Sequence, residues 1–237
     1  MRLHYLQHIA LENPGHILGW AKKKGHNVTQ TRFFAGEPLP QVEDLDWLIV
    51  MGGSMNIYEE DQFPWLAAEK AFLRSAIEEH KLVLGICLGA QLLTDVIGGK
   101  VTANDQPEIG WWPVTWSEEA RTSPLFAHFP ESSTVFHWHY DTFSTLPPEA
   151  KVLASSPVCR NQAFQYRDHV IGLQFHLENT EELLEGYVQH FAGELNGRGY
   201  VQTPEQILAQ RDYVAENNRW MEGLLDKLEE SWSKKSI

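Results

Sequence analysis

This chain of 237 residues is short of cysteine, of basic side chains and of long apolar runs. Its two cysteines, Cys87 and Cys159, are too few for a disulfide framework, and they form no Cys-x-x-Cys metal site. No apolar run approaches the ~18 residues of a membrane-spanning helix, and the amino-terminal segment lacks the apolar core of a secretion signal. These absences predict a protein of the reducing cytoplasm without a membrane partner.

Basic residues are scarce relative to acidic ones. Lysine and arginine number 19 against 32 aspartates and glutamates, so the formal net charge is −13. Binding to a phosphate backbone requires clustered basic side chains, so we expect no nucleic-acid partner. The phosphate-binding pattern Gly-x-x-x-x-Gly-Lys-Ser/Thr is absent as well, so the chain shows no signature of ATP binding.

Strand-like and helix-like segments alternate over the first hundred residues. The expected elements are strands at 3–9, 27–33, 47–51 and 82–86 and helices at 14–24, 63–80 and 90–97. This alternation is typical of an α/β fold in which a doubly wound, mostly parallel sheet carries helices on both faces. Between residues 100 and 174, short β-rich runs are separated by proline and polar clusters, which predicts added antiparallel strands.

A break at residues 196–199 separates the predicted main domain, residues 1–196, from a predicted helical extension, residues 197–237. Within the extension, residues 203–206 form a capping box with proline at the first helical position. Apolar residues follow at near-heptad spacing and predict one long helix over 204–232. This helix either packs back on the domain or docks on another subunit, which would be a second copy in a homodimer or a synthetase partner.

Cys87 lies in the most informative segment. Residues 85–91 have the sequence GICLGAQ and connect an apolar strand to a helix. Gly85 and Gly89 bracket the cysteine as in a nucleophile elbow, where a strained turn needs small neighbours. The turn places the sulfur at a helix amino terminus, where backbone N–H groups favour the reactive thiolate. The alternative interpretation is an ordinary buried cysteine before a glycine-containing turn.

A second segment supplies the partners that a nucleophile needs. Residues 170–178 form a predicted apolar strand that ends in His176 and Glu178. Side chains two apart on a strand share a face, so Glu178 can hold one imidazole nitrogen while the other faces Cys87. This is the nucleophile–base–orienter arrangement of a catalytic triad. Both segments end where open α/β sheets place their sites.

Five segments together resemble the class I glutamine amidotransferases. Residues 85–91 and 172–178 are similar to the two triad signatures of that family. The other similar segments are LIVMGGSM at 48–55, EIGWWPV at 108–114 and FHWHYDTF at 136–143. They follow the family's order, and the chain most resembles free-standing members similar to the glutaminase part of GMP synthetase. The domain over residues 1–196 is therefore identified as a class I glutamine amidotransferase domain.

The resemblance implies a reaction and a set of roles. It implies hydrolysis of the glutamine side-chain amide by a Cys87–His176–Glu178 triad through a γ-glutamyl thioester, with ammonia passed to an acceptor, for example a synthetase subunit in trans. It implies an oxyanion hole made by the backbone N–H groups of Gly53 and Leu88, and it calls for no cofactor. The residues that it places around the substrate are Gly52, Gln91, His139, Tyr140 and Asp141.

Alternatives remain open for the substrate and for the class of activity. Tyr140 stands where many relatives have glycine, and its ring would narrow the pocket or change which γ-glutamyl compound fits. Hydrolysis of γ-glutamyl peptides is therefore the second enzymatic interpretation, and a non-catalytic binding module is a third. An α/β-hydrolase would use Asp141 or Asp168 as its acid, but it would leave Glu178 unexplained.

Histidine is plentiful, with 11 residues. His137 and His139 share a strand face near Asp141, and two histidines with a carboxylate can bind a metal. The family resemblance already accounts for this segment, and triad chemistry needs no metal. We therefore expect no metal site.

Overall fold

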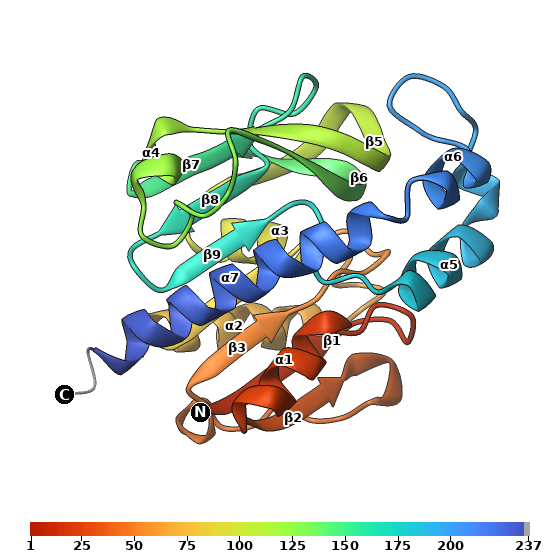
Figure 1. Ribbon diagram of the computed structural model, residues 1–237. Coiled ribbons are helices and arrows are strands. Elements are labelled where there is room, and N and C mark those ends of the chain that lie inside the picture. The colour runs from red at the N-terminus through yellow and green to blue at the C-terminus, as the bar shows by residue number, and fades with distance from the viewer. Residues whose placement is uncertain (235–237) are drawn as a thin grey trace.

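One sheet of nine strands forms the centre of the computed structural model, which describes residues 1–234 (Figure 1). The strand order is β2-β1-β3-β4-β9-β8-β7-β5-β6. The first five of these run parallel, and the remaining four continue the sheet in antiparallel pairs. The strands are β1 (Arg2–Gln7), β2 (Asn27–Arg32), β3 (Trp47–Val50), β4 (Leu82–Ile86), β5 (Lys100–Trp116), β6 (Ser132–Thr145), β7 (Ala150–Ser155), β8 (Ala163–Tyr166) and β9 (Val170–Leu173).

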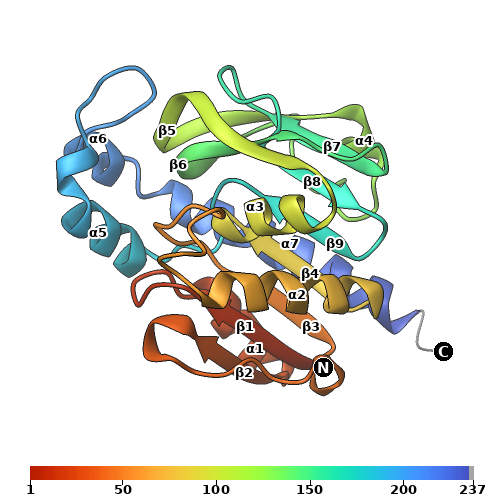
Figure 2. The same ribbon diagram turned by 180° about the vertical axis from the view of Figure 1, so that it is seen from behind.

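Helices cover both faces of the parallel half (Figures 1 and 2). Helices α1 (His16–Lys24) and α7 (Tyr213–Ser233) lie on one face, and α2 (Trp65–Glu78) and α3 (Leu88–Val96) lie on the other. The shorter helices are α4 (Glu118–Thr122), α5 (Glu181–His190) and α6 (Pro204–Ala209). The predicted doubly wound α/β fold with added antiparallel strands is confirmed. None of the described helices is long and apolar enough to cross a membrane.

The apolar runs of the sequence become the central strands because both of their faces are covered. Every residue of β3 and β4 is buried, and parallel strands between two helical layers carry apolar side chains on both sides. Trp20 of α1 and Leu225 of α7 belong to the apolar cluster on one face, whereas Phe72 of α2 and Leu92 of α3 belong to the cluster on the other. The carboxyl ends of β3 and β4 therefore meet at one edge of a rigid sheet.

The extension differs from the single helix predicted over 204–232. The predicted capping box starts α6, but α6 ends at Ala209 and α7 begins at Tyr213. The two helices pack on different partners, because the Trp111 indole of β5 donates to the Ile207 carbonyl of α6, whereas α7 lies along α1. One straight helix over this segment would not contact both β5 and α1. The last residues of the predicted extension, 235–237, lie outside the described part of the chain.

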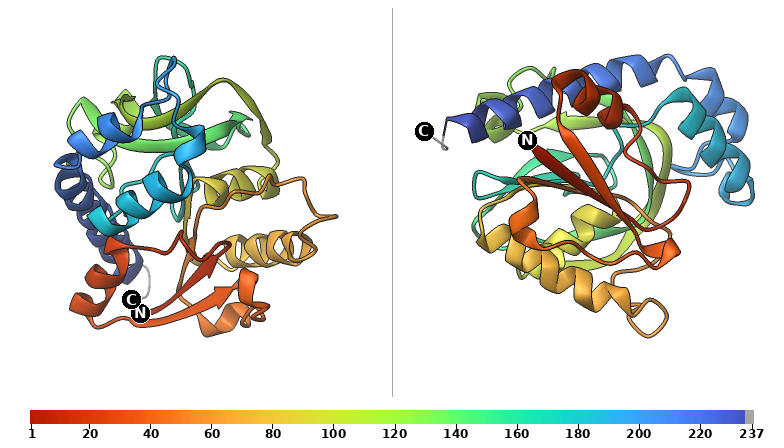
Figure 3. Two further views of the ribbon diagram at one scale, coloured as in Figure 1. Left: turned by 90° about the vertical axis from the view of Figure 1, so that its right-hand side faces the viewer. Right: turned by 90° about the horizontal axis from the view of Figure 1, so that it is seen from below.

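Helix α7 packs back on the main domain. Its buried Met221, Leu224, Leu225 and Leu228 belong to the same apolar cluster as β3, β4 and α1. Lys24 at the end of α1 forms an ion pair with Asp226 at 2.8 Å. The end of α7 therefore lies on the same side of the molecule as the amino terminus (Figure 3).

Strand β9 is shorter than the predicted strand over 170–178. It ends at Leu173, and the backbone N–H of His176 donates to the carbonyl of Phe136 at 2.8 Å. The chain thus leaves β4 and forms an isolated antiparallel bridge with β6. This crossing carries His176 from the edge of the parallel strands toward the antiparallel ribbon.

Candidate active site

Cys87 occupies a strained turn between β4 and α3. Its backbone has φ 52° and ψ −111°, a conformation that residues with a side chain rarely adopt. A Cβ atom at Gly85 would lie 2.7 Å from the backbone of Gly89, and one at Gly89 would lie 2.1 Å from the carbonyl oxygen of Val50. Both neighbours must therefore be glycine, and the turn has the geometry of a nucleophile elbow.

His176 and Glu178 form a buried pair beside Cys87. Nδ1 of His176 lies 2.6 Å from Oε1 of Glu178, and both side chains are almost fully buried. Burial alone lowers the pKa of His176, but the Glu178 charge and the hydrogen bonds of His176 with Cys87 and Glu178 hold this pKa well above its ordinary value. The structure thus brings together the three residues that the sequence analysis grouped as a triad.

The environment of the Cys87 sulfur opposes its ionisation. Burial raises the pKa of the thiol, and the Glu12 carboxylate raises it further. The hydrogen bond and charge of His176 and the backbone N–H of Leu88 act in the opposite direction. The sulfur also lies 3.6 Å from the carbonyl oxygen of Trp138. Formation of the thiolate therefore depends on His176 and on the amino terminus of α3.

A second buried pair holds the Gly52–Gly53 loop after β3. Nδ1 of His8 lies 2.9 Å from the Gly52 carbonyl oxygen, and Nε2 lies 2.9 Å from Oε1 of Glu69. Both partners are acceptors, so both ring nitrogens must donate and the ring is protonated. Burial alone lowers the pKa of His8, but the charge and hydrogen bond of Glu69 raise it above its ordinary value.

This contact orients the peptide between Gly52 and Gly53. The carbonyl and N–H of a trans peptide point in opposite directions, so the Gly52 carbonyl that faces His8 aims the Gly53 N–H away from it. Gly53 lines the pocket beside Cys87. A Cβ atom on Gly53 would lie 2.6 Å from the Met55 sulfur and 3.0 Å from Cβ of His8, so a larger residue there would force its neighbours to shift.

A pocket of about 250 Å³ opens in front of Cys87. The lining residues that the sequence analysis singled out are Gly53, Cys87, Gln91, His139, Tyr140, Asp141 and His176. Gly52 and Leu88 adjoin lining residues in the chain, and Glu178 follows the lining residue His176 by two positions, but none of the three is part of the lining. Most of the other lining residues were not predicted from the sequence, among them Glu12, Asn56, Glu59, Trp138, Tyr187, Phe191 and Glu194.

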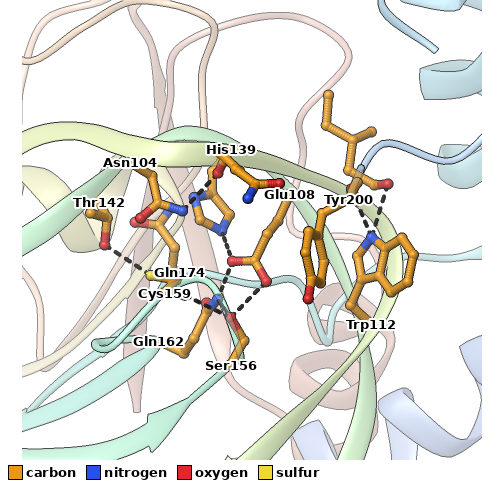
Figure 4. Close-up of polar contacts among 12 residues, drawn as sticks. Asn104, Glu108, Trp112, His139, Thr142, Ser156, Cys159, Gln162, Gln174 and Tyr200 are labelled. Carbon is orange, nitrogen blue, oxygen red and sulfur yellow. Dashed lines mark hydrogen bonds and ion pairs between the residues drawn. The ribbon is translucent and has the colours of Figure 1, made fainter. Parts of the chain in front are cut away.

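A buried polar network orders the segment that contains His139 and Asp141 (Figure 4). Glu108 of β5 accepts hydrogen bonds from Ser156 at 2.6 Å and from Gln162 at 2.6 Å, and it pairs with Nε2 of His139 at 3.0 Å. Nδ1 of His139 reaches the Asp141 carbonyl oxygen at 2.9 Å. Burial alone raises the pKa of Glu108, but its hydrogen bonds and the nearby histidines hold this pKa below the ordinary value.

Gln91 of α3 joins the same segment. Its Nε2 donates to the Asp141 carbonyl at 3.1 Å and to the Gln174 side chain at 3.2 Å. The carboxylate of Asp141 in turn accepts a hydrogen bond from the Asn56 amide. These contacts make one wall of the pocket from α3, β6 and the loop after β3.

Tyr140 stands at the rim of the pocket. Its side chain is 50% exposed, and its hydroxyl donates to Oε2 of Glu194 at 2.8 Å. Burial, together with this hydrogen bond, raises the pKa of Tyr140 to about 12. The phenol therefore stays protonated at neutral pH and bridges the rim from β6 to the segment after α5.

The histidine pair that could bind a metal has Glu108 as its carboxylate neighbour and not Asp141. Ligand atoms of Glu108, His137 and His139 all lie within 4.8 Å of one another, and all three residues are buried. Burial lowers the pKa of His137 to about 4, so its ring is neutral. The Glu108 oxygens, however, are already engaged by Ser156, Gln162 and His139.

Two of the missed lining residues had weak signals in the sequence. Glu12 follows β1, and the carboxyl end of a parallel strand is where such sheets place their sites. Tyr187 lies on α5, the helix after the triad segment, where its spacing fits an apolar face. Neither residue has a local pattern that separates a pocket position from a core or loop position, so only the structure identifies them.

Comparisons with known proteins identify the family of this chain. The family model for glutamine amidotransferase class-I matches residues 21–191. The chain is 35% identical to the glutamine amidotransferase-like protein YfeJ of Salmonella typhimurium, over 99% of this chain and 100% of that protein. It is 33% identical to the glutamine-hydrolyzing GMP synthase of Thermomicrobium roseum over 70% of this chain, which spans only 32% of that enzyme.

A solved structure extends the comparison to three dimensions. The crystal structure of a glutamine amidotransferase from Methylobacillus flagellatus superimposes with a TM-score of 0.90 at 30% sequence identity, and the match covers 97% of this chain and 94% of the other. The family match spans most of the elements that build the pocket, including β4, α3, β6, β9 and α5. The chain therefore belongs to the class-I glutamine amidotransferase family.

Proposed function

We propose that this protein hydrolyses the side-chain amide of glutamine to glutamate and ammonia, with Cys87 as nucleophile, His176 as acid–base group and Glu178 as the orienting carboxylate. The observation that carries the proposal is the strained Cys87 turn beside the buried pair of His176 and Glu178, which are 2.6 Å apart. A buried imidazole that a carboxylate orients, beside a sulfur at a helix amino terminus, serves nucleophilic catalysis.

The reaction proceeds through a thioester. His176 takes the proton of the Cys87 thiol as the sulfur attacks the amide carbon. The oxyanion that forms accepts hydrogen bonds from the N–H groups of Gly53 and Leu88. His176 gives its proton to the departing nitrogen, the carbon–nitrogen bond breaks and ammonia leaves. Water, activated by His176, then attacks the thioester and releases glutamate. Gln91 and the backbone near Asp141 bind the amino-acid end of the substrate.

An acceptor for the ammonia lies outside this chain in the proposal. The chain spans about a third of the Thermomicrobium GMP synthase, and we propose that a synthetase in trans uses the ammonia here. Hydrolysis of γ-glutamyl peptides is the second candidate, because the Tyr140 ring lies half-exposed at the rim of the pocket and does not fill it.

Glutamate release tests the proposal directly. Purified wild-type protein and the Cys87→Ser variant are incubated with glutamine and, separately, with γ-glutamyl dipeptides. We expect glutamate from glutamine with the wild type and a loss of several orders of magnitude in the variant. Equal release by both proteins would overturn the assignment of Cys87, and release from dipeptides alone would favour the second candidate.

A further inference from the structure

Two buried oxygens in the pocket lack hydrogen-bond partners. Oε2 of Glu12 and the hydroxyl of Tyr187 are buried and have no partner among the described residues. Both residues line the pocket that contains Cys87 and His176, and Tyr187 is only 4% exposed. An unpaired buried polar atom costs about 1–3 kcal/mol, so these oxygens call for a ligand that provides hydrogen-bond donors.

The carboxylate of Glu12 lies directly beside the nucleophile. A Cβ atom on Gly52 would lie 1.9 Å from Oε2 of Glu12 and 3.4 Å from Cβ of Cys87. Glycine at position 52 therefore leaves the space that the carboxylate occupies. The loop that carries Glu12 is tied to the triad, because the backbone N–H of His16 donates to the Glu178 carbonyl oxygen at 2.8 Å.

Tyr187 approaches the same group from α5. The centre of its ring lies 6.4 Å from the centre of the His176 imidazole. The charges of Glu12, Glu178 and Cys87 all act on the phenol, after burial as the largest influence, and they raise its pKa well above the ordinary value. The hydroxyl therefore remains protonated, and its oxygen can still accept a hydrogen bond.

The His176 charge acts on the Glu12 carboxyl, and the Tyr187 ring lies beside the His176 ring, so both groups lie near His176. Gln91 and Asp141 come from α3 and β6. In the proposed reaction, the departing nitrogen faces His176, which protonates it. A primary amide nitrogen carries two hydrogens and takes a third from His176 as the carbon–nitrogen bond breaks. Its two original hydrogens need two acceptors, and a secondary amide has a carbon atom in place of one of them.

We propose that Glu12 and Tyr187 form a subsite for the leaving nitrogen, which binds the NH2 group of a primary amide and so selects glutamine over γ-glutamyl peptides. The inference rests on the proposed hydrolysis and names its substrate class. With a secondary amide, an alkyl group would face one of the two oxygens and leave it unpaired. Sites built to hydrogen-bond a substrate group discriminate strongly against analogues that lack it.

The test compares glutamine with γ-glutamylmethylamide, which differs by one methyl group on the nitrogen. We measure kcat and KM for both compounds in the wild type and in the Glu12→Leu and Tyr187→Phe variants. We expect the wild type to favour glutamine by roughly 10²-fold or more in kcat/KM. Each variant should reduce this preference at least about tenfold, mainly through a lower kcat for glutamine.

Three controls separate a subsite from a structural role. Glu12→Gln keeps an acceptor oxygen at nearly constant volume and should retain more of the preference than Glu12→Leu. Tyr166→Phe removes a phenol hydroxyl on β8, outside the pocket lining, and should leave both rates unchanged. Thermal unfolding midpoints show whether each variant is folded.

The outcomes distinguish this inference from the proposed function. An active wild type that does not discriminate, or variants that slow both substrates equally, would overturn the subsite alone. Failure of the wild type to release glutamate from either compound, or equal release by the wild type and the Cys87→Ser variant, would overturn the proposed hydrolysis and the subsite together.

Discussion

Removing the carboxylate of Glu69 should destabilise the protein and disturb the loop beside Cys87. His8 and Glu69 are both fully buried as side chains and lie 2.9 Å apart. Phe33 and Trp65 stack on the His8 ring at centroid distances of 5.6 and 5.4 Å, so solvent cannot easily replace the partner. Breaking a buried pair by removing one member costs about 3–5 kcal/mol.

For a protein of this size, that cost corresponds to a fall in Tm of roughly 6–20 °C for Glu69→Leu. Thermal and urea unfolding of the wild type and of Glu69→Leu and Glu69→Gln measure it. The Gln variant keeps an oxygen acceptor for Nε2 of His8, so its loss should be smaller. The Glu69→Leu variant should also have a lower kcat, because the Gly53 N–H loses its orientation. The decrease should be up to roughly 10²-fold, which is about what the loss of one oxyanion-hole donor costs.

The stability difference between the wild type and the Glu69→Leu variant should depend on pH in a defined direction. In the wild type, the folded-state pKa of His8 is raised, so the stabilisation is fully present below the unfolded pKa of about 6.5 and is lost as pH rises through the folded pKa. Without Glu69, burial favours the neutral ring, and the variant loses stability as pH falls below about 6.5. The difference in unfolding free energy should therefore grow as pH falls from 9 to 5. A difference that is absent, or that grows with rising pH, would refute the reasoning.

Three further predictions follow from single positions. Gly52→Ala should lower kcat with little change in Tm, because its Cβ would displace Oε2 of Glu12, which would lie 1.9 Å away; steady-state kinetics that match the wild type would contradict this. Leu225→Ala should cost about 2–5 kcal/mol in urea unfolding, since this residue of α7 is fully buried in the core; a loss below about 1 kcal/mol would mean that α7 contributes little to the fold. Alkylation of Cys87 by iodoacetamide should still accelerate above pH 9, because burial raises the pKa of its thiol; a rate that levels off near pH 7 would show a thiolate already formed.

Local sequence pattern was sufficient to predict the parts of the site that lie at the ends of central strands. Gly85, Cys87 and Gly89 stand between an apolar strand and a helix, so the turn could be predicted from three residue types and their spacing. His176 and Glu178 were paired for the same kind of reason, although β9 ends at Leu173 and the pair lies beyond it. The pairing survives because the two residues are close in sequence and remain beside Cys87.

The boundary between α6 and α7 could not be predicted, because both halves of the segment carry apolar residues at helical spacing. The break is decided by what each half contacts, which is Trp111 for α6 and α1 for α7. The metal-site alternative, which the sequence analysis raised and set aside, shows the same limit. Spacing suggested Asp141 as the third partner of two histidines, whereas pairing of β5 with β6 brings Glu108 to them.

The sequence by itself determined the fold class, the family and the candidate triad, because periodicity and short-range spacing carry that information. Only the tertiary structure decided which other groups face Cys87. Glu12 reaches the pocket from the loop after β1, Tyr187 from α5, and the His8–Glu69 pair joins β1 to α2 behind the Gly52 loop. These contacts join residues that are far apart in the chain, and no local pattern encodes which loop will close over which strand end.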